Sequence, residues 1–185
     1  MNSLHIPRTT HYAARLALLF IILLAAYLRL NHLEWTEFKL DEAHLSQLAY
    51  DMARHGQIPL TGIGSSVGVV NPPLAAWLLA MPYAVSASPM VATGFIAALN
   101  VLAVIACYLL ARRLFNSHGA ALIATLLFAV SPWAIIHARK VWAQDLLPPF
   151  VMLWAWFGYR AFIEGKRWSL IGHGLMLAAA IQLHY

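Results

Sequence analysis

Two short stretches of the sequence contain charged side chains that could act on a substrate. In the first, residues 38–44 read FKLDEAH, so Asp41 and Glu42 are adjacent carboxylates and His44 follows one helical turn after Asp41. A carboxylate held at the start of a helix can accept a proton from a hydroxyl group within hydrogen-bond reach. Glu42 would point about 100° around the helix from Asp41 and is expected to hold the loop or an acceptor. Asp41 and Glu42 are the candidate catalytic residues.

The second stretch, residues 137–149, reads HARKVWAQDLLPP and places two cations ahead of an acid. Arg139 and Lys140 offer a site for a phosphate-sized anion, and Asp145 is expected to be the only acid near them. Alternatively, both cations reach to a membrane interface and Asp145 caps the next helix. A divalent metal held by Asp145, or by His44 together with Asp41 one helical turn before it, is a further option.

The letters DEAH are also the signature of a class of nucleic-acid helicases. Such helicases need a phosphate-binding loop of the form G-x-x-x-x-G-K-[ST], and this pattern does not occur in the chain. The net charge of +5 comes from basic residues that are thinly spread and flank apolar runs. We therefore expect no nucleic-acid partner.

Hydrophobic residues make up 62% of the 185 residues and charged residues only 10%, against about 25% in ordinary soluble proteins. This composition predicts an integral membrane protein in contact with membrane lipids. The apolar runs approach the roughly 20 residues that a helix needs to cross a bilayer. They predict an all-α, polytopic transmembrane helix bundle of about five spans, at residues 13–30, 90–110, 119–137, 146–162 and 168–185.

The basic residues predict how these spans are oriented. If the apolar segment 72–89 does not cross, seven of the twelve basic residues lie on the cytoplasmic side, but only four do if it crosses. The first arrangement agrees with the positive-inside tendency. We therefore expect the N-terminus inside, an outer loop of about residues 29–89 with short juxtamembrane helices, and an active site facing outside the plasma (inner) membrane.

The outer loop is expected to contain two helices. Residues 41–56 have a helical rhythm, with Asp41 at the N-cap position and Gly56 as the stop. Asn71 is expected to cap a second helix that has prolines in its first turn. Asp41 is then either a general base or only a cap. No charged residue lies in the middle of a predicted span, which argues against a transporter or channel.

Taken in order along the chain, these stretches resemble one family. The order is a first span, DEAH, NPPL at 71–74, a span ending ARRLF at 111–115, a span opening GAALIATLLF at 119–128, and then Asp145. It resembles the N-terminal part of GT-C glycosyltransferases of the protein O-mannosyltransferase and aminoarabinose lipid A transferase type. The resemblance covers nearly all of the chain from about Leu16.

The resemblance implies an inverting hexosyl- or pentosyltransferase. Such an enzyme takes a sugar from a polyprenyl-phosphate donor and passes it to a lipid, glycan or protein acceptor on the outer face. It implies that Asp41 is the catalytic base and Glu42 its neighbouring acid. It also implies that Asp145 is a second acidic site residue, which lies near a divalent metal in some relatives. Arg139 would lie near the donor phosphate, with Lys140 as a second phosphate-binding cation.

The chain also departs from this family. Family members are much longer, so the resemblance implies an N-terminal fragment in which the roles of His173, Gln182 and His184 depend on further residues. Asn71 stands where relatives often have a histidine, which removes a candidate ligand. Two other functions stay open: a non-catalytic polytopic membrane scaffold, and a transporter or flippase component for lipid-linked precursors.

Overall fold

The computed structural model describes residues 8–64 and 68–183, and these residues are largely helical. No strand occurs in these two ranges, in which a single isolated β-bridge joins Gly64 to Val70. The predicted all-α class is confirmed. His184 lies outside the described residues.

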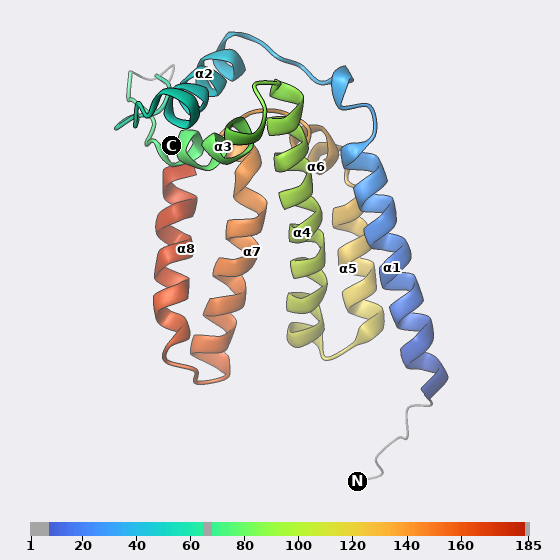
Figure 1. The fold of residues 1–185 in the computed structure, drawn as a ribbon. Helices are drawn as coiled ribbons and strands as arrows, with labels where there is room; N and C mark the ends of the chain where they lie inside the picture. The colour runs from blue at the N-terminus through green and yellow to red at the C-terminus, as the bar shows by residue number, and fades with distance from the viewer. Residues whose placement is uncertain (1–7, 65–67, 184–185) are drawn as a thin grey trace.

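Five helices lie side by side and form the body of the molecule (Figure 1). They are α1 (Arg8–Leu30), α4 (Pro89–Phe115), α5 (His118–Val130), α7 (Leu147–Gly158) and α8 (Ser169–Leu183). Three stretches are long and apolar enough to cross a bilayer: Tyr12–Leu30, Pro89–Phe115 and Gln144–Ile163. The last of these includes a π-helical turn, Tyr159–Ile163, directly after α7. Because α5 and α8 are shorter, the count of five spans stays a prediction.

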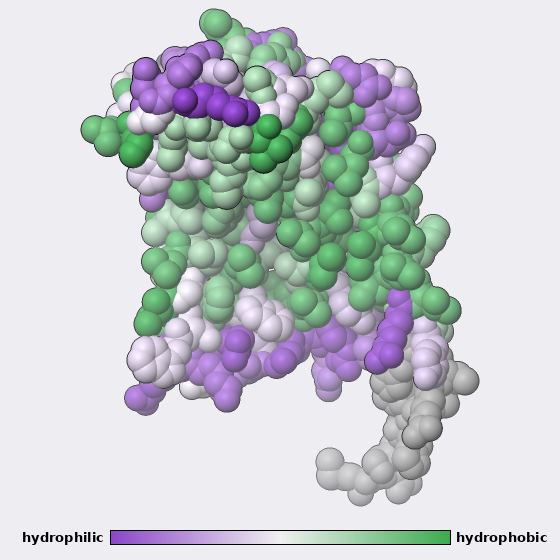
Figure 2. Space-filling model, viewed as in Figure 1, coloured by the Kyte–Doolittle hydropathy of each residue, from purple (hydrophilic) through white to green (hydrophobic). Residues whose placement is uncertain are grey.

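The surface of this body is apolar where a bilayer would surround it. Figure 2 shows hydrophobic side chains across the middle of the helices and hydrophilic ones at both ends. Large apolar side chains on the outer helices are exposed, among them Leu19, Leu23, Ile123, Leu127 and Leu175. Lipid tails are as apolar as leucine and solvate such side chains, whereas water does not. The chain is an integral membrane protein.

Short helices cover one end of the body. They are α2 (Leu40–His55), α3 (Leu74–Val85) and α6 (Pro132–His137), which lie at the same end in Figure 1. Two 3₁₀ turns, η1 (Leu33–Trp35) and η2 (Gln144–Leu146), link them to the body. At the opposite end Arg113 forms an ion pair with Glu164. Both charged stretches singled out in the sequence therefore meet at the end that carries α2.

Helix α2 begins one residue earlier than the sequence predicted. Its N-cap is Lys39, and the backbone N–H of Lys39 donates to Oε2 of Glu42 at 3.0 Å. Asp41 lies inside the first turn, so the prediction that it is the N-cap is wrong. The error arises because a glutamate at the third helical position can satisfy the cap backbone from within the helix, without a polar cap side chain. Gly56 ends the helix in the left-handed conformation (φ 69°), as predicted.

Helix α3, in contrast to α2, begins later than predicted. Its N-cap is Pro73, so both prolines precede the helix and Asn71 does not cap it. The backbone of Asn71 instead pairs with the preceding loop, because its carbonyl accepts from Gly62 N–H at 2.6 Å and its N–H donates to Ile63 at 3.0 Å. With twelve residues, α3 is about 18 Å long, which is shorter than the hydrocarbon core of a bilayer.

The largest core cluster joins the covering helices to the body. It includes Leu45 and Ala49 of α2, Leu79 of α3, Ile96 of α4 and Leu146 of η2, each at most 1% exposed. These residues come from both predicted charged stretches and from the helices between them. The packing therefore fixes α2 and η2 relative to each other, and with them the charged residues that they carry.

Arg29, near the end of α1, is buried between helices. Its guanidinium donates to the backbone carbonyls of Ala129 at 2.8 Å and Phe128 at 3.1 Å. These carbonyls belong to the last turn of α5, which has no further helical N–H partners. Arg29 thus caps the C-terminal end of α5 from a neighbouring helix and ties α1 to α5.

Replacing Arg29 by methionine should therefore destabilise the bundle. Losing two hydrogen bonds from a charged donor to buried carbonyls is expected to lower the free energy of unfolding by about 2–4 kcal/mol. The measurement is thermal unfolding in detergent micelles. Arg112→Met is the matched control, because Arg112 bonds only to Asn116 at an exposed position and should change stability by less than about 0.5 kcal/mol. Equal effects of the two variants would contradict the capping role.

Candidate active site

An ion pair joins the two charged stretches, which are about a hundred residues apart in the sequence. Nζ of Lys140 lies 2.8 Å from Oε1 of Glu42 and 3.1 Å from Oε2 of Glu37. The side chain of Glu42 is 2% exposed. Lys140 also lies 5.4 Å from the ring centre of Trp142. The expectation that Asp145 is the only acid near the cations is therefore wrong, because two glutamates contact Lys140 directly.

The ion pair changes the pKa values of both partners. Burial raises the pKa of Glu42, but the hydrogen bond from Lys140 and those from backbone N–H groups lower it, so that it lies below its usual range. The hydrogen bond to Glu42 raises the pKa of Lys140 above its usual value, although burial works in the opposite direction. Both groups are therefore charged at neutral pH, and each carboxylate oxygen of Glu42 already accepts from a donor, Oε1 from Lys140 and Oε2 from the backbone N–H of Lys39.

Asp145 lies in η2, directly before α7, and is 3% exposed. Its Oδ1 lies 3.0 Å from Nδ1 of His137, whereas its Oδ2 is buried without a hydrogen-bond partner among the described residues. The N-cap of α7 is Leu146, so the alternative reading of Asp145 as a helix cap is wrong. Lys140 and Glu42 are near enough to act on it electrostatically.

Asn100 of α4 fixes the backbone at Asp145. Its Nδ2 donates to the carbonyl of Asp145 at 2.9 Å and to that of Ile96 at 3.0 Å. Asn100 is 2% exposed and lies in the interior of the longest helix. A buried side-chain amide in this position anchors η2 to the body of the bundle.

A cavity of about 400 Å³ opens beside Asp145. Oε1 of Gln144 is also buried there without a partner in the described part of the chain. The walls of this cavity come from α4, the α5–α6 junction, η2 and the start of α7. They are formed by Asn100, Ser131, Trp133, Ala134, His137, Gln144, Asp145 and Pro148. Two neighbouring buried oxygen atoms without partners in a cavity wall are ready acceptors for a ligand, a cation or water.

Asp41 and His44 lie on the exposed side of α2. Glu42, by contrast, points inward to Lys140, as the angle between successive helical residues requires. The structure thus brings Glu42, Lys140 and Asp145 together but leaves Asp41 facing outward. His44 is exposed, and the histidine that contacts buried Asp145 is His137.

Arg139 is held against the segment that follows α1. Its guanidinium donates to the carbonyl of His32, and its own carbonyl accepts from the hydroxyl of Thr36. Arg139 and Lys140 line a second cavity, of about 380 Å³, whose other walls are Trp35, Thr36, Glu37, Ile135 and Ile136. Two cations above apolar walls offer surroundings for a phosphate that is attached to a lipid chain.

The residues that could hold a metal are few. Within residues 8–64 and 68–183 no group of three or more His, Cys, Asp and Glu side chains is placed to bind a metal ion. Asp145 Oδ2 and Gln144 Oε1 would supply two oxygen ligands. A magnesium ion commonly takes one or two carboxylates and completes its shell with water and substrate phosphates, so this donor set fits that type of site.

The sequence did not identify three residues of this site: Asn100, His137 and Gln144. Asn100 could have been noticed as an amide inside an apolar run, where an unpaired polar group is costly. His137 and Gln144 flank the cations and the acid of the second stretch, but their spacing matches no motif. Their roles depend on the turn at η2.

A bundle of apolar helices with a buried carboxylate, an ion pair and cation-lined cavities at one end has the features of a membrane enzyme. A family model described as dolichyl-phosphate-mannose-protein mannosyltransferase matches residues 70–185, which is more than half of the chain. The chain belongs to this family of membrane glycosyltransferases, so the resemblance predicted from the sequence is confirmed. No curated protein and no solved structure matches the chain. The match includes Arg139, Lys140 and Asp145 but not Asp41, Glu42 and His44.

Proposed function

We propose that this membrane glycosyltransferase moves a sugar from a polyprenyl-phosphate donor to a hydroxyl group of a lipid, glycan or protein acceptor. The reaction takes place at the end that carries α2, which faces the extracytoplasmic side of the plasma (inner) membrane. One observation carries the proposal: the contact of Glu42 with Lys140 and the closeness of both to buried Asp145. This contact brings acids and a cation together at the end of the apolar surface of the helix bundle, at the depth where the phosphate of a membrane lipid lies.

Asp41 is the base in this proposal. The acceptor oxygen attacks the anomeric carbon, its proton passes to the carboxylate of Asp41, and the bond from that carbon to the phosphate oxygen breaks. Attack opposite the leaving group inverts the anomeric centre. The exposed position of Asp41 on the first turn of α2 leaves it open to an acceptor that arrives from outside the membrane.

Arg139 and Lys140 stabilise the negative charge on the departing polyprenyl phosphate. Both line the cavity with walls of Trp35, Ile135 and Ile136, which would contact the first part of the lipid chain. Arg139 has further N–H donors beyond the one that it gives to His32. Glu42 acts through Lys140, which it holds in place.

A divalent cation, if one takes part, would be held by Asp145 and Gln144. It would neutralise phosphate charge next to Lys140. His137 holds the other oxygen of Asp145, which orients the carboxylate toward the cavity.

The donor and the side of the membrane can be tested together. Sealed membrane vesicles of both orientations are given labelled polyprenyl-phosphate sugars or, as a control, the matching nucleotide sugars. We expect transfer only from the lipid-linked donor, and only in vesicles whose extracytoplasmic face is accessible to the acceptor. Transfer from the nucleotide sugar, or equal transfer in both orientations, would contradict the proposal. Movement of the donor across the membrane without bond cleavage would point to a transporter.

A further inference from the structure

A separate cavity of about 330 Å³ lies beneath α2, away from the charged residues. Four of its wall residues come from one face of α2, at spacings of three and four: Ala43, Ser46, Gln47 and Tyr50. The facing walls are Phe38, Tyr83, Ala87 and Pro89. None of these side chains carries a charge, so the cavity differs from the two that contain Lys140 or Asp145.

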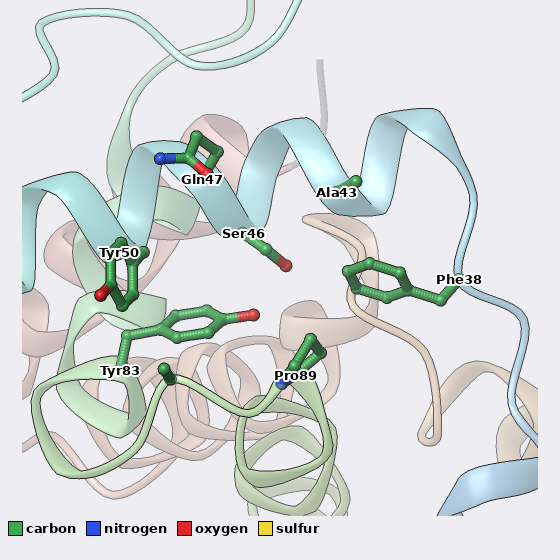
Figure 3. A pocket seen from close by; sticks show the side chains of 8 residues that line it. Phe38, Ala43, Ser46, Gln47, Tyr50, Tyr83 and Pro89 are labelled. Atoms are coloured by element: carbon green, nitrogen blue, oxygen red, sulfur yellow. The ribbon is translucent and has the colours of Figure 1, made fainter.

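Two hydroxyl groups in this cavity are buried. Ser46 is 7% exposed and Tyr83 is 2% exposed, and their hydroxyls are near enough to interact with each other, but neither makes a hydrogen bond of ordinary geometry in the described ranges. Figure 3 shows both hydroxyls pointing into the space between α2 and the start of α4, with the ring of Phe38 on the opposite side. A buried hydroxyl without a well-formed hydrogen bond is costly, and even after contact with each other these two have donor and acceptor capacity left for a ligand in the cavity.

The walls define the chemistry of the missing partner. It must donate to and accept from hydroxyls, lie against aromatic rings, and carry no charge, because no charged side chain faces it. A pyranose ring meets these conditions, since its hydroxyls are donors and acceptors and its C–H faces are apolar. The volume is at the small end of ligand cavities and suits one ring. Water alone would satisfy the hydroxyls but would leave Phe38 and Tyr50 against a polar neighbour.

We propose that this cavity binds one neutral sugar ring and so positions a saccharide next to the reaction site. The same helix carries both sites, because Glu42 contacts Lys140 and Ser46 lies one turn further along α2. The role of the bound ring rests on the proposed function, in which the ring is part of either the acceptor or the donor. Binding of the ring itself does not depend on catalysis.

The test measures the binding of neutral methyl glycosides to the purified protein in detergent micelles by saturation-transfer NMR. We expect millimolar binding that is about tenfold weaker in Tyr83→Phe and in Ser46→Ala. Because each of these variants removes a hydroxyl that makes no hydrogen bond of ordinary geometry, neither should lower the unfolding temperature by more than the Tyr108→Phe control does. Tyr108→Phe is the matched control: its hydroxyl is paired with His118 at 2.8 Å, outside the cavity, so it should lower stability and leave binding unchanged.

The outcomes separate the two proposals. Absence of glycoside binding, or equal binding in Tyr83→Phe, Ser46→Ala and the unchanged protein, would overturn the sugar site and leave a water-filled cavity. Binding in a protein that shows no transfer from polyprenyl-phosphate sugars would support the cavity and contradict the proposed donor. Competition between the glycoside and the polyprenyl-phosphate sugar would assign the ring to the donor, whereas simultaneous binding would assign it to the acceptor.

Discussion

Replacing Asp41 by asparagine is expected to lower the rate of glycosyl transfer by about 10²–10⁴-fold, the usual contribution of a general base. Asparagine has nearly the same shape but cannot accept the proton of the acceptor hydroxyl. The structural cost should be small, because Asp41 is exposed and is not the N-cap of α2. Losing a charge from the first turn of a helix costs about 0.3–1 kcal/mol. The rate is measured with labelled polyprenyl-phosphate sugar in membranes.

Asp51→Asn is the matched control for this experiment. Asp51 is a carboxylate on the same helix, ten residues further along, and pairs locally with Gln47 at 2.9 Å and His55 at 3.0 Å. We expect transfer by this variant to remain within about twofold of the unchanged protein, since Asp51 is a surface carboxylate whose hydrogen bonds are local to α2. If Asp41→Asn transfers sugar as fast as Asp51→Asn does, Asp41 is not the base.

Replacing Lys140 by methionine should strongly lower stability. Methionine keeps much of the volume but leaves the carboxylate of Glu42 buried without its cation. Breaking a buried ion pair from one side costs about 3–5 kcal/mol, because the remaining charge loses its partner but not its burial. Because Lys140 is partly exposed, we expect the free energy of unfolding to fall by about 3 kcal/mol, at the low end of this range. The measurement is thermal unfolding in detergent.

Two further variants show whether the cause is the unpaired charge. Glu37→Gln removes the exposed partner of Lys140 and should lower stability much less than Lys140→Met does. The double variant Glu42→Gln with Lys140→Met removes both buried charges and should recover more than half of the stability that Lys140→Met loses. A double variant as unstable as Lys140→Met alone would show that packing, not charge, explains the loss.

Much of the fold could be predicted from the sequence because the apolar runs and their breaks are local features. The periodicity of residues 41–56 predicted α2, and Gly56 predicted its end, since a left-handed stop favours glycine. The order of short motifs predicted the family. The positions of α5 and α8 were predicted as well, but α5 is shorter than the expected span 119–137. Ser131 and Pro132 begin a new helix there.

The candidate site was harder to predict because its contacts join distant parts of the chain. The sequence showed that Glu42 and Lys140 are charged, but not that they form a pair about a hundred residues apart. The capping role of Glu42 was missed because Lys39 is not a usual cap residue. The partners of Asp145 depend on where η2 lies against α4, which no local spacing reveals.

The short length of α5 changes how the bilayer meets this side of the protein. Its thirteen residues span about 20 Å, roughly two thirds of a hydrocarbon core about 30 Å thick. Where α5 stops, Arg29 and the polar cavity at Ser131 begin. Local thinning is one way for a bilayer to match this short apolar wall, and it would bring the headgroups closer to Asp145. A lipid-borne phosphate could then approach the site by sideways diffusion, without leaving the bilayer.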